Sequence, residues 1–435
     1  MRIVFRERVN RLMRTHLLLG MLVALNTLGL FLTQLLVFTE FGTGSTTDAF
    51  VAATTIPQTL TVIVSVSLYN VLVPLFAGEG IESQHDDAWG VLSLLALVAL
   101  VFSAILYATC SWWIPLVFPG FDTETVALCV DLTRIQVFSI LFTVAAGVTT
   151  AVYHARHQFV LVATRMLIIT SLSVVALYFL LPLYGITTAA WVVLLSAVFQ
   201  FFVLTPSLGL PRKKILFSPA VKASWENMKP MLAGNAYYKT DILVDRYLLS
   251  MGSAGDLSLY SLGRQVYDAA GGIISKVLGN TAVPRLAIFF KGRDRTGFKA
   301  LSGRRLFIIS GLAVLGYIIL LFSGESLLSL LVGYGQMKGE TIHQLWQLMV
   351  LLGGTFVFGI VGALLAGMFY AIGDTRTPTY MSMISFTFFI LIKILSYRYF
   401  GIYGLCIATS VYFFTNALLM LLLFPSKFRQ SLSHA

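Results

Sequence analysis

Residues 17–38 read LLLGMLVALNTLGLFLTQLLVF, a largely apolar run without a charged side chain. Its length matches the ~20 residues that an α-helix needs to cross the hydrocarbon core of a bilayer. Residues 160–181 form a second such run, with Arg165 as its one charge. Helices satisfy their backbone hydrogen bonds internally, as hydrocarbon requires, whereas strands of a membrane barrel would alternate in polarity over about ten residues. The two runs therefore predict transmembrane helices.

The composition of the whole chain agrees with this prediction. Of its 435 residues, 57% are hydrophobic and 11% are charged, whereas soluble domains carry about 25% charged residues. We therefore expect an all-α polytopic membrane protein with about twelve transmembrane helices in two six-helix lobes around a central cavity. The predicted spans are residues 17–38, 50–76, 89–117, 132–153, 159–181, 185–206, 229–250, 258–288, 305–332, 343–371, 378–398 and 402–424.

The basic residues orient these spans. They concentrate in the N-terminal arm and in the segments 209–228, 290–305 and 425–435, which all fall on one side if twelve helices alternate. By the positive-inside rule that side is the cytoplasm, so both termini are predicted to be cytoplasmic. The rule also explains the net charge of +11 without a nucleic-acid partner. The acidic loop 78–88 fits less well, but acidic residues count little in this rule.

An internal repeat divides the chain. Residues 41–77 align without a gap with residues 251–287, at an offset of 210. Such repeats indicate a duplicated unit, and an even number of helices in each half makes the two halves parallel. The pairs that carry the alignment best are Asn70 with Asn280 and Pro74 with Pro284, and a second match pairs Tyr184-Gly185-Ile186 with Phe400-Gly401-Ile402.

The repeat predicts a domain organisation. We expect a basic cytoplasmic arm (1–16), an N-terminal lobe (17–208), a cytoplasmic linker (209–228), a C-terminal lobe (229–424) and a cytoplasmic tail (425–435). Transporters built from such repeats place their substrate path between the halves.

Charged residues inside the predicted spans are the candidate binding residues. A charge at mid-bilayer costs roughly 2.5–3.5 kcal/mol on insertion scales, so it persists only beside a wet cavity or another charge. Arg264 and Asp268 are one helical turn apart on one face. The charges either neutralise one another to hold the second lobe together or, as we favour, line a cavity for an anionic headgroup. The cavity candidates are Lys239, Asp241, Asp245, Arg246, Arg264, Asp268 and Lys276, with Asp48 at the mouth of the second span and Lys393 in the eleventh.

The sequence offers no sign of an enzyme or a metal site. It lacks a Walker A loop and the H-E-x-x-H and G-x-S-x-G motifs. Cys110, Cys129 and Cys406 have no metal-binding spacing, and we expect small apolar fillers rather than a Cys110–Cys129 disulfide. His154 and His157 are expected to be a loop pair. No cofactor is expected, and coupling to an ion gradient or to the membrane potential is left open.

Several motifs resemble the MurJ/MviN family of lipid II flippases, within the multidrug/oligosaccharidyl-lipid/polysaccharide exporter superfamily. The segment Thr47-Asp48-Ala49-Phe50, followed by Ile56-Pro57 and Pro74, is similar to the family's second span. Asp245 and residues 258–264 resemble its seventh and eighth spans. The most specific match is FYAIGDTRTP at residues 369–378, which includes Asp374, Arg376 and Pro378 and resembles the family motif between spans ten and eleven.

The resemblance implies alternating access and a cavity in which arginines contact the diphosphate of an undecaprenyl-linked precursor. Arg264 matches the family's arginine in span eight, and Asp48 its aspartate in span two. Asp374, Arg376 and Pro378 would then belong to a gating motif. The family's arginines in span one have no counterpart in residues 17–38, and its two extra C-terminal helices are not found. The expected substrate is therefore lipid II or a related exopolysaccharide or O-antigen unit in the bacterial inner membrane.

Three other classes compete with a flippase. A cation-coupled antiporter of small amphipathic molecules would share the fold, but its cavity would be lined by fewer cationic than anionic side chains. A membrane enzyme would usually need a large outer loop, and the longest predicted outer loop, near residues 118–131, is short. A transport-inactive scaffold would recruit glycan-synthesis enzymes. The expected partners are the polyprenyl-diphosphate glycan, membrane lipids and such enzymes.

Overall fold

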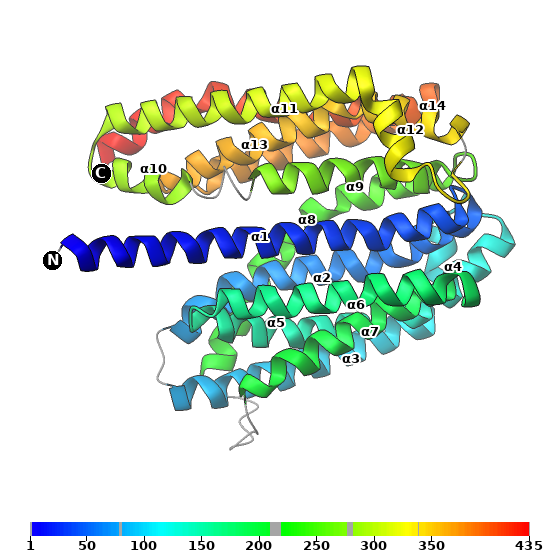
Figure 1. Cartoon of the computed structure of the whole chain (residues 1–435), viewed down its shortest axis with the longest axis horizontal. Coiled ribbons are helices and arrows are strands. Elements are labelled where there is room, and N and C mark those ends of the chain that lie inside the picture. The colour runs from blue at the N-terminus through cyan, green and yellow to red at the C-terminus, as the bar shows by residue number, and fades with distance from the viewer. Residues whose placement is uncertain (1, 78–80, 209–218, 276–281, 338, 435) are drawn as a thin grey trace. The chain divides into compact units, whose positions relative to one another are not determined.

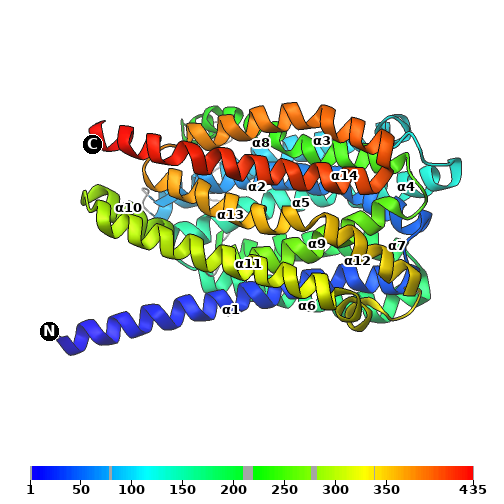
Figure 2. The same ribbon diagram turned by 90° about the horizontal axis from the view of Figure 1, so that it is seen from above.

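The computed structural model describes residues 2–77, 81–208, 219–275, 282–337 and 339–434, and within these ranges the chain forms helices and no strands (Figure 1 and, from a second side, Figure 2). Contacts divide it into a first unit, Met1–Gly255, and a second unit, Asp256–Ala435. The first unit contains α1 (Arg2–Phe41), α2 (Ser45–Ala77), α3 (Ile81–Val117), α4 (Thr123–Gln136), α5 (Ser139–Ala155), α6 (Phe159–Tyr184), α7 (Thr187–Leu204), the short helix η1 (Thr205–Leu208) and α8 (Pro219–Ser250).

The second unit is built in the same way from long helices. It contains α9 (Asp256–Ile274), α10 (Ala282–Lys291), α11 (Arg295–Val332), α12 (Gly339–Leu351), α13 (Gly353–Ala371) and α14 (Arg376–His434). The backbone of α14 leaves the helical region at Gly401 (φ 56°, ψ −143°), so α14 consists of two helices joined there.

The twelve predicted spans lie in helical structure except at residues 137–138, 185–186 and 352, which are turns between helices, and at residues 276–281, which are outside the described ranges. Nine helical stretches among the described residues are long and apolar enough to cross a membrane. The α-helical multi-pass fold is therefore confirmed, whereas the count of twelve stays a prediction. The difference arises because α8 and α9 are rich in polar residues and because the two halves of α14 count as one stretch.

The apolar surface of these helices is arranged for lipid. In the most hydrophobic window of α11 only 11% of the residues are buried inside the protein, and Phe307 and Phe322 are 81% and 82% exposed. In water such a surface would drive association, but in a bilayer it meets acyl chains. Inside each unit the buried apolar side chains form a core. Helices α2, α3 and α5 share one core in the first unit, and α10, α11, α13 and α14 share one in the second.

The three cysteines belong to these interiors. Cys110, Cys129 and Cys406 are free and buried. This placement agrees with their predicted role as small apolar fillers rather than with a disulfide.

The helix α8 packs against α2 and α3 of the first unit. Its Asn235 amide donates a hydrogen bond to the Ser67 hydroxyl of α2 at 3.1 Å. The sequence had assigned the same span to the C-terminal lobe, and that lobe boundary stays a prediction.

Both units carry the same interruptions. The fourth predicted span is broken between α4 and α5, and the tenth is broken at Leu352, between α12 and α13. Gly185 (φ 74°) and Gly401 (φ 56°), paired by the second sequence match, both have positive φ and both separate two helices. The repeat also predicts that Asn70 superposes on Asn280, and this stays a prediction because Asn280 lies outside the described residues.

Candidate functional site

Arg264 and Asp268 lie in one pocket of the second unit. The buried residues of α9 include Leu257, Leu262 and Tyr267, and the helix packs against α12 and α13. The same helix brings Arg264, half-buried, and Asp268, exposed, to a cavity of about 290 Å³ between α9, α13 and α14. The predicted i,i+4 pair therefore borders a space in which a ligand could reach both side chains.

Aromatic side chains line the same cavity. The guanidinium carbon of Arg264 lies 5.8 Å from the centre of the Phe413 ring, a cation–π distance. Tyr267 stacks on Phe356 with ring centres 5.0 Å apart and donates its hydroxyl to the Met349 carbonyl. An arginine beside such rings has less water around it, which strengthens its attraction for an anion.

The charged residues predicted on α8, which are Lys239, Asp241, Asp245 and Arg246, all belong to the first unit. Arg246 donates to the Val51 carbonyl at 2.8 Å and to the Thr55 hydroxyl at 2.7 Å, both on α2. Asp245 is 4% exposed, and Lys239 and Asp241 are half-buried. These contacts give Arg246 a role in anchoring α8 to α2, which the sequence did not predict because span pairing is not visible in spacing.

Asp48 also makes a contact inside the first unit. It is 3% exposed, and its carboxylate accepts the Gly255 backbone N–H at 2.6 Å. Gly255 has φ +99°, and a Cβ there would lie 3.3 Å from the Thr43 backbone, so only glycine suits this turn. The geometry assigns Asp48 to holding the turn after α8 against the start of α2.

The FYAIGDTRTP motif forms a helix start. The Asp374 carboxylate accepts the backbone N–H groups of Arg376 and Thr377 at 3.1 and 2.9 Å, and the Thr377 hydroxyl at 2.7 Å. Pro378 lies in the first turn of α14, where a missing N–H costs nothing. Helix capping accounts for Asp374 and Pro378. Two predicted cavity residues remain: Lys276 lies outside the described residues, and Lys393 is 1% exposed with its amine 5.8 Å from the centre of the Tyr412 ring.

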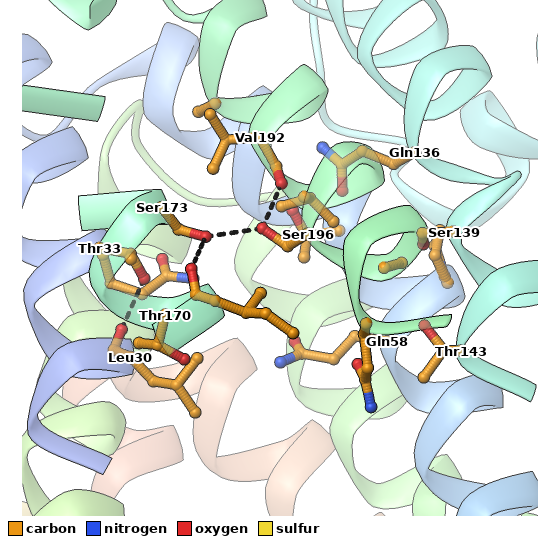
Figure 3. A pocket seen from close by; sticks show the side chains of 18 of the residues that line it. Leu30, Thr33, Gln58, Gln136, Ser139, Thr143, Thr170, Ser173, Val192 and Ser196 are labelled. Carbon is orange, nitrogen blue, oxygen red and sulfur yellow. Dashed lines mark hydrogen bonds between the residues drawn. The ribbon is translucent and has the colours of Figure 1, made fainter. Parts of the chain in front are cut away.

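A second pocket, which the sequence did not single out, lies within the first unit (Figure 3). Its volume is about 370 Å³, and helices α1, α2 and α4 to α7 line it. Its described lining residues carry amides and hydroxyls but no charge. Asn26, Thr33 and Gln34, which are polar residues of the first predicted span, belong to this wall.

The two pockets occupy matching positions in the repeat. At the offset of 210, Arg264 pairs with Thr54 and Asp268 with Gln58. Both partners line the neutral pocket, and their exposures match: Thr54 is half-buried like Arg264, and Gln58 is exposed like Asp268. The repeat was therefore the signal that could have located the second pocket once the first was chosen.

Comparison with known proteins gives a consistent family. A model of the family "Lipid II flippase MurJ" matches residues 37–433. The chain is 25% identical to a lipid II flippase MurJ of Burkholderia cenocepacia, over 79% of this chain and 70% of that protein.

Two solved structures share the fold. A lipid II flippase MurJ in an inward closed conformation aligns with a TM-score of 0.82 at 17% identity, over 94% of this chain and 87% of that one. An inward-facing multidrug resistance transporter of the MATE family aligns with a TM-score of 0.75 at 15% identity, over 93% and 95% of the two chains. The family match spans most of the sequence, and this multi-pass membrane protein belongs to the lipid II flippase MurJ family.

Proposed function

We propose that the protein translocates a polyprenyl-diphosphate-linked glycan, lipid II or a related exopolysaccharide or O-antigen unit, across the bacterial inner membrane by alternating access. The observation that carries the proposal is the presence of Arg264 and Asp268 at one pocket of a membrane-spanning unit, in a chain of the MurJ family. A charge inside a transmembrane segment is costly and points to a functional site by default.

The chemistry of the pocket suits a diphosphate. Arginine presents a planar fork that binds two phosphate oxygens at once, which lysine cannot do. The Phe413 ring beside the guanidinium reduces competition from water. Asp268, one turn away, offers the guanidinium a carboxylate when the substrate leaves. Release requires that the contact weaken in the outward state, since a ligand bound equally in both states shifts no population.

The remaining predicted residues support the path indirectly. Asp48 and Arg246 hold the start of α2 and α8 together, and Asp374 fixes the start of α14. We keep both termini on the cytoplasmic side, as the basic segments indicate. Coupling to an ion gradient or to the membrane potential, and association with glycan-synthesis enzymes, remain parts of the proposal.

The first prediction tests Arg264. Purified protein in liposomes should move an undecaprenyl-diphosphate-linked disaccharide between leaflets, measured by loss of accessibility to an added glycan-modifying enzyme. Arg264→Ala should abolish this transfer and Arg264→Lys should reduce it at least tenfold, because the bidentate contact is lost. The control is Arg285→Ala, which removes an exposed arginine on α10 in the same unit and should leave the rate unchanged.

The outcomes separate the alternatives. Transfer by Arg264→Ala at the wild-type rate would show that the arginine is structural. Wild-type liposomes that move a small amphipathic cation but no lipid-linked glycan would favour the antiporter. Liposomes that move neither would favour the transport-inactive scaffold.

A further inference from the structure

The neutral pocket of the first unit has the composition of a binding site rather than of a packing defect. Its volume of about 370 Å³ falls in the range of roughly 300–1,000 Å³ that small-molecule sites occupy. Five amide side chains face it from several helices, among apolar residues such as Leu30, Met166 and Val192. The amides are those of Asn26, Gln34, Gln58, Gln136 and Gln200.

The side-chain amide of Gln136, at the wall of this pocket, makes no hydrogen bond among the described residues. Its side chain is 0% exposed, and within the described part of the chain neither its amide nitrogen nor its amide oxygen has a hydrogen-bond partner. A buried amide without partners costs free energy, so native proteins rarely leave one unpaired. Gln136 lines the pocket, so a turn of its side chain toward the space would bring the amide to a group that both donates and accepts hydrogen bonds.

The opposite wall is already ordered. The Ser173 and Ser196 hydroxyls are 2.7 Å apart, and the Thr170 hydroxyl donates to the Asn26 amide oxygen at 2.7 Å. Figure 3 shows the Ser173–Ser196 pair on one side of the view and Gln136, with Ser139 and Thr143, on the other. One wall is therefore fixed by its own hydrogen bonds, and the other offers groups to a ligand.

The backbone is also broken at this wall. The break between α4 and α5 lies between Gln136 and Ser139, both of which line the pocket. The matching break between α12 and α13 lies beside Thr355, which lines the charged pocket. Broken helices at membrane depth are tolerated where they line a cavity, and they commonly mark transporter binding sites.

The side chains define the ligand class. With no carboxylate among the described lining residues, a divalent cation finds no suitable ligands. With no lysine, arginine or histidine among them, a phosphate finds no counter-charge. Amides and hydroxyls, placed among apolar side chains, match the hydroxyl and acylamino groups and the apolar ring faces of an uncharged sugar. The exposed Gln58 and the buried Gln136 place these groups from the surface of the unit to its interior.

We infer that this pocket binds an uncharged, acylamino-bearing sugar residue of the transported glycan, an inference that rests on the proposed function. The two halves of the repeat then divide the recognition of one substrate class by chemistry. The charged pocket takes the diphosphate, and its neutral counterpart takes the sugar.

The test uses a probe with neither lipid nor phosphate. Binding of N,N′-diacetylchitobiose to the full chain in lipid nanodiscs is measured by calorimetric titration. We expect the wild type to bind it, and Gln136→Leu and Thr143→Val each to weaken binding about tenfold, the effect of one or two lost hydrogen bonds. Thr133→Val is the matched control, because Thr133 is buried on the same helix as Gln136 and does not line the pocket. Arg264→Ala should leave disaccharide binding unchanged.

A wild type that does not bind the disaccharide, or pocket variants that bind it like the wild type, would overturn the inference. If Gln136→Leu does not fold, Thr143→Val at the same wall decides the result alone. Because the probe carries no diphosphate, failure here leaves the Arg264 transfer assay untouched. If Arg264→Ala loses glycan transfer while the wild type does not bind the disaccharide, the protein is still a flippase, but this pocket is not its sugar site.

Discussion

The two units carry one helical plan with two different pockets. In the second unit the pocket contains Arg264 and Asp268, whereas the corresponding positions in the first unit are Thr54 and Gln58. The burial of these pairs is alike. The duplicated framework therefore fixes where a cavity forms, and the side chains placed in it decide whether that cavity attracts an anion or an uncharged group.

The helix breaks point the same way. A hydroxyl from a neighbouring helix supports each break: Ser103 donates to the Val137 carbonyl at 3.2 Å, and Ser410 donates to the Leu351 carbonyl at 2.5 Å. Backbone groups freed inside a membrane need such partners. The supported helix break is thus common to both units, whereas the charge of the pocket beside it differs between them.

A charge moved from one pocket to the other should have the largest effect on stability. Thr54→Arg places an arginine in the neutral pocket without a carboxylate among its described lining residues. We expect a loss of about 3 kcal/mol in unfolding free energy, the cost of an unpaired charge in a membrane interior. Thermal unfolding of the purified protein measures it.

The paired exchange sharpens that result. Adding Gln58→Asp to Thr54→Arg recreates the i,i+4 pair of the second unit and should recover about 1 kcal/mol or more, because an arginine with a carboxylate one turn away is no longer uncompensated. If Thr54→Arg alone unfolds like the wild type, the first pocket tolerates charge and the contrast between the units fails.

A smaller effect concerns the helix starts that follow the broken spans. In the second unit Asp374 caps α14 with three hydrogen bonds, whereas in the first unit Gln158 precedes α6 without a side-chain cap. Asp374→Ala should cost about 1 kcal/mol of stability, the usual value of an N-cap. Thermal unfolding would show the loss, and Asp374→Asn, which keeps a cap, should restore most of it. Equal stability of Asp374→Ala and wild type would exclude a capping role.

Sequence patterns predicted the helices well because apolar runs near 20 residues allow few other structures in a bilayer. They also placed Arg264 and Asp268 together, since i,i+4 spacing fixes one face of a helix. They missed the pairing of α8 with α2 through Arg246, because contacts between helices distant in sequence leave no local signal. They missed the neutral pocket for a related reason: its polar residues are spread over six helices, and none of them alone stands out.

The last prediction concerns a helix cap that the second unit has and the first unit lacks. The turn before α6 holds His157 at φ 59° and Gln158 without a cap bond, whereas the turn before α14 holds Gly373 at φ 80° before the capping Asp374. Gln158→Asp should add about 0.5 kcal/mol of stability, because an aspartate oxygen can reach the free N–H groups of the first turn and meets the positive end of the helix. The rise in unfolding temperature is compared with that of Gln158→Glu, which carries the same charge but reaches the backbone poorly. If the two variants are equally stable, the gain comes from charge alone, and the helix starts of the two units do not differ in capping.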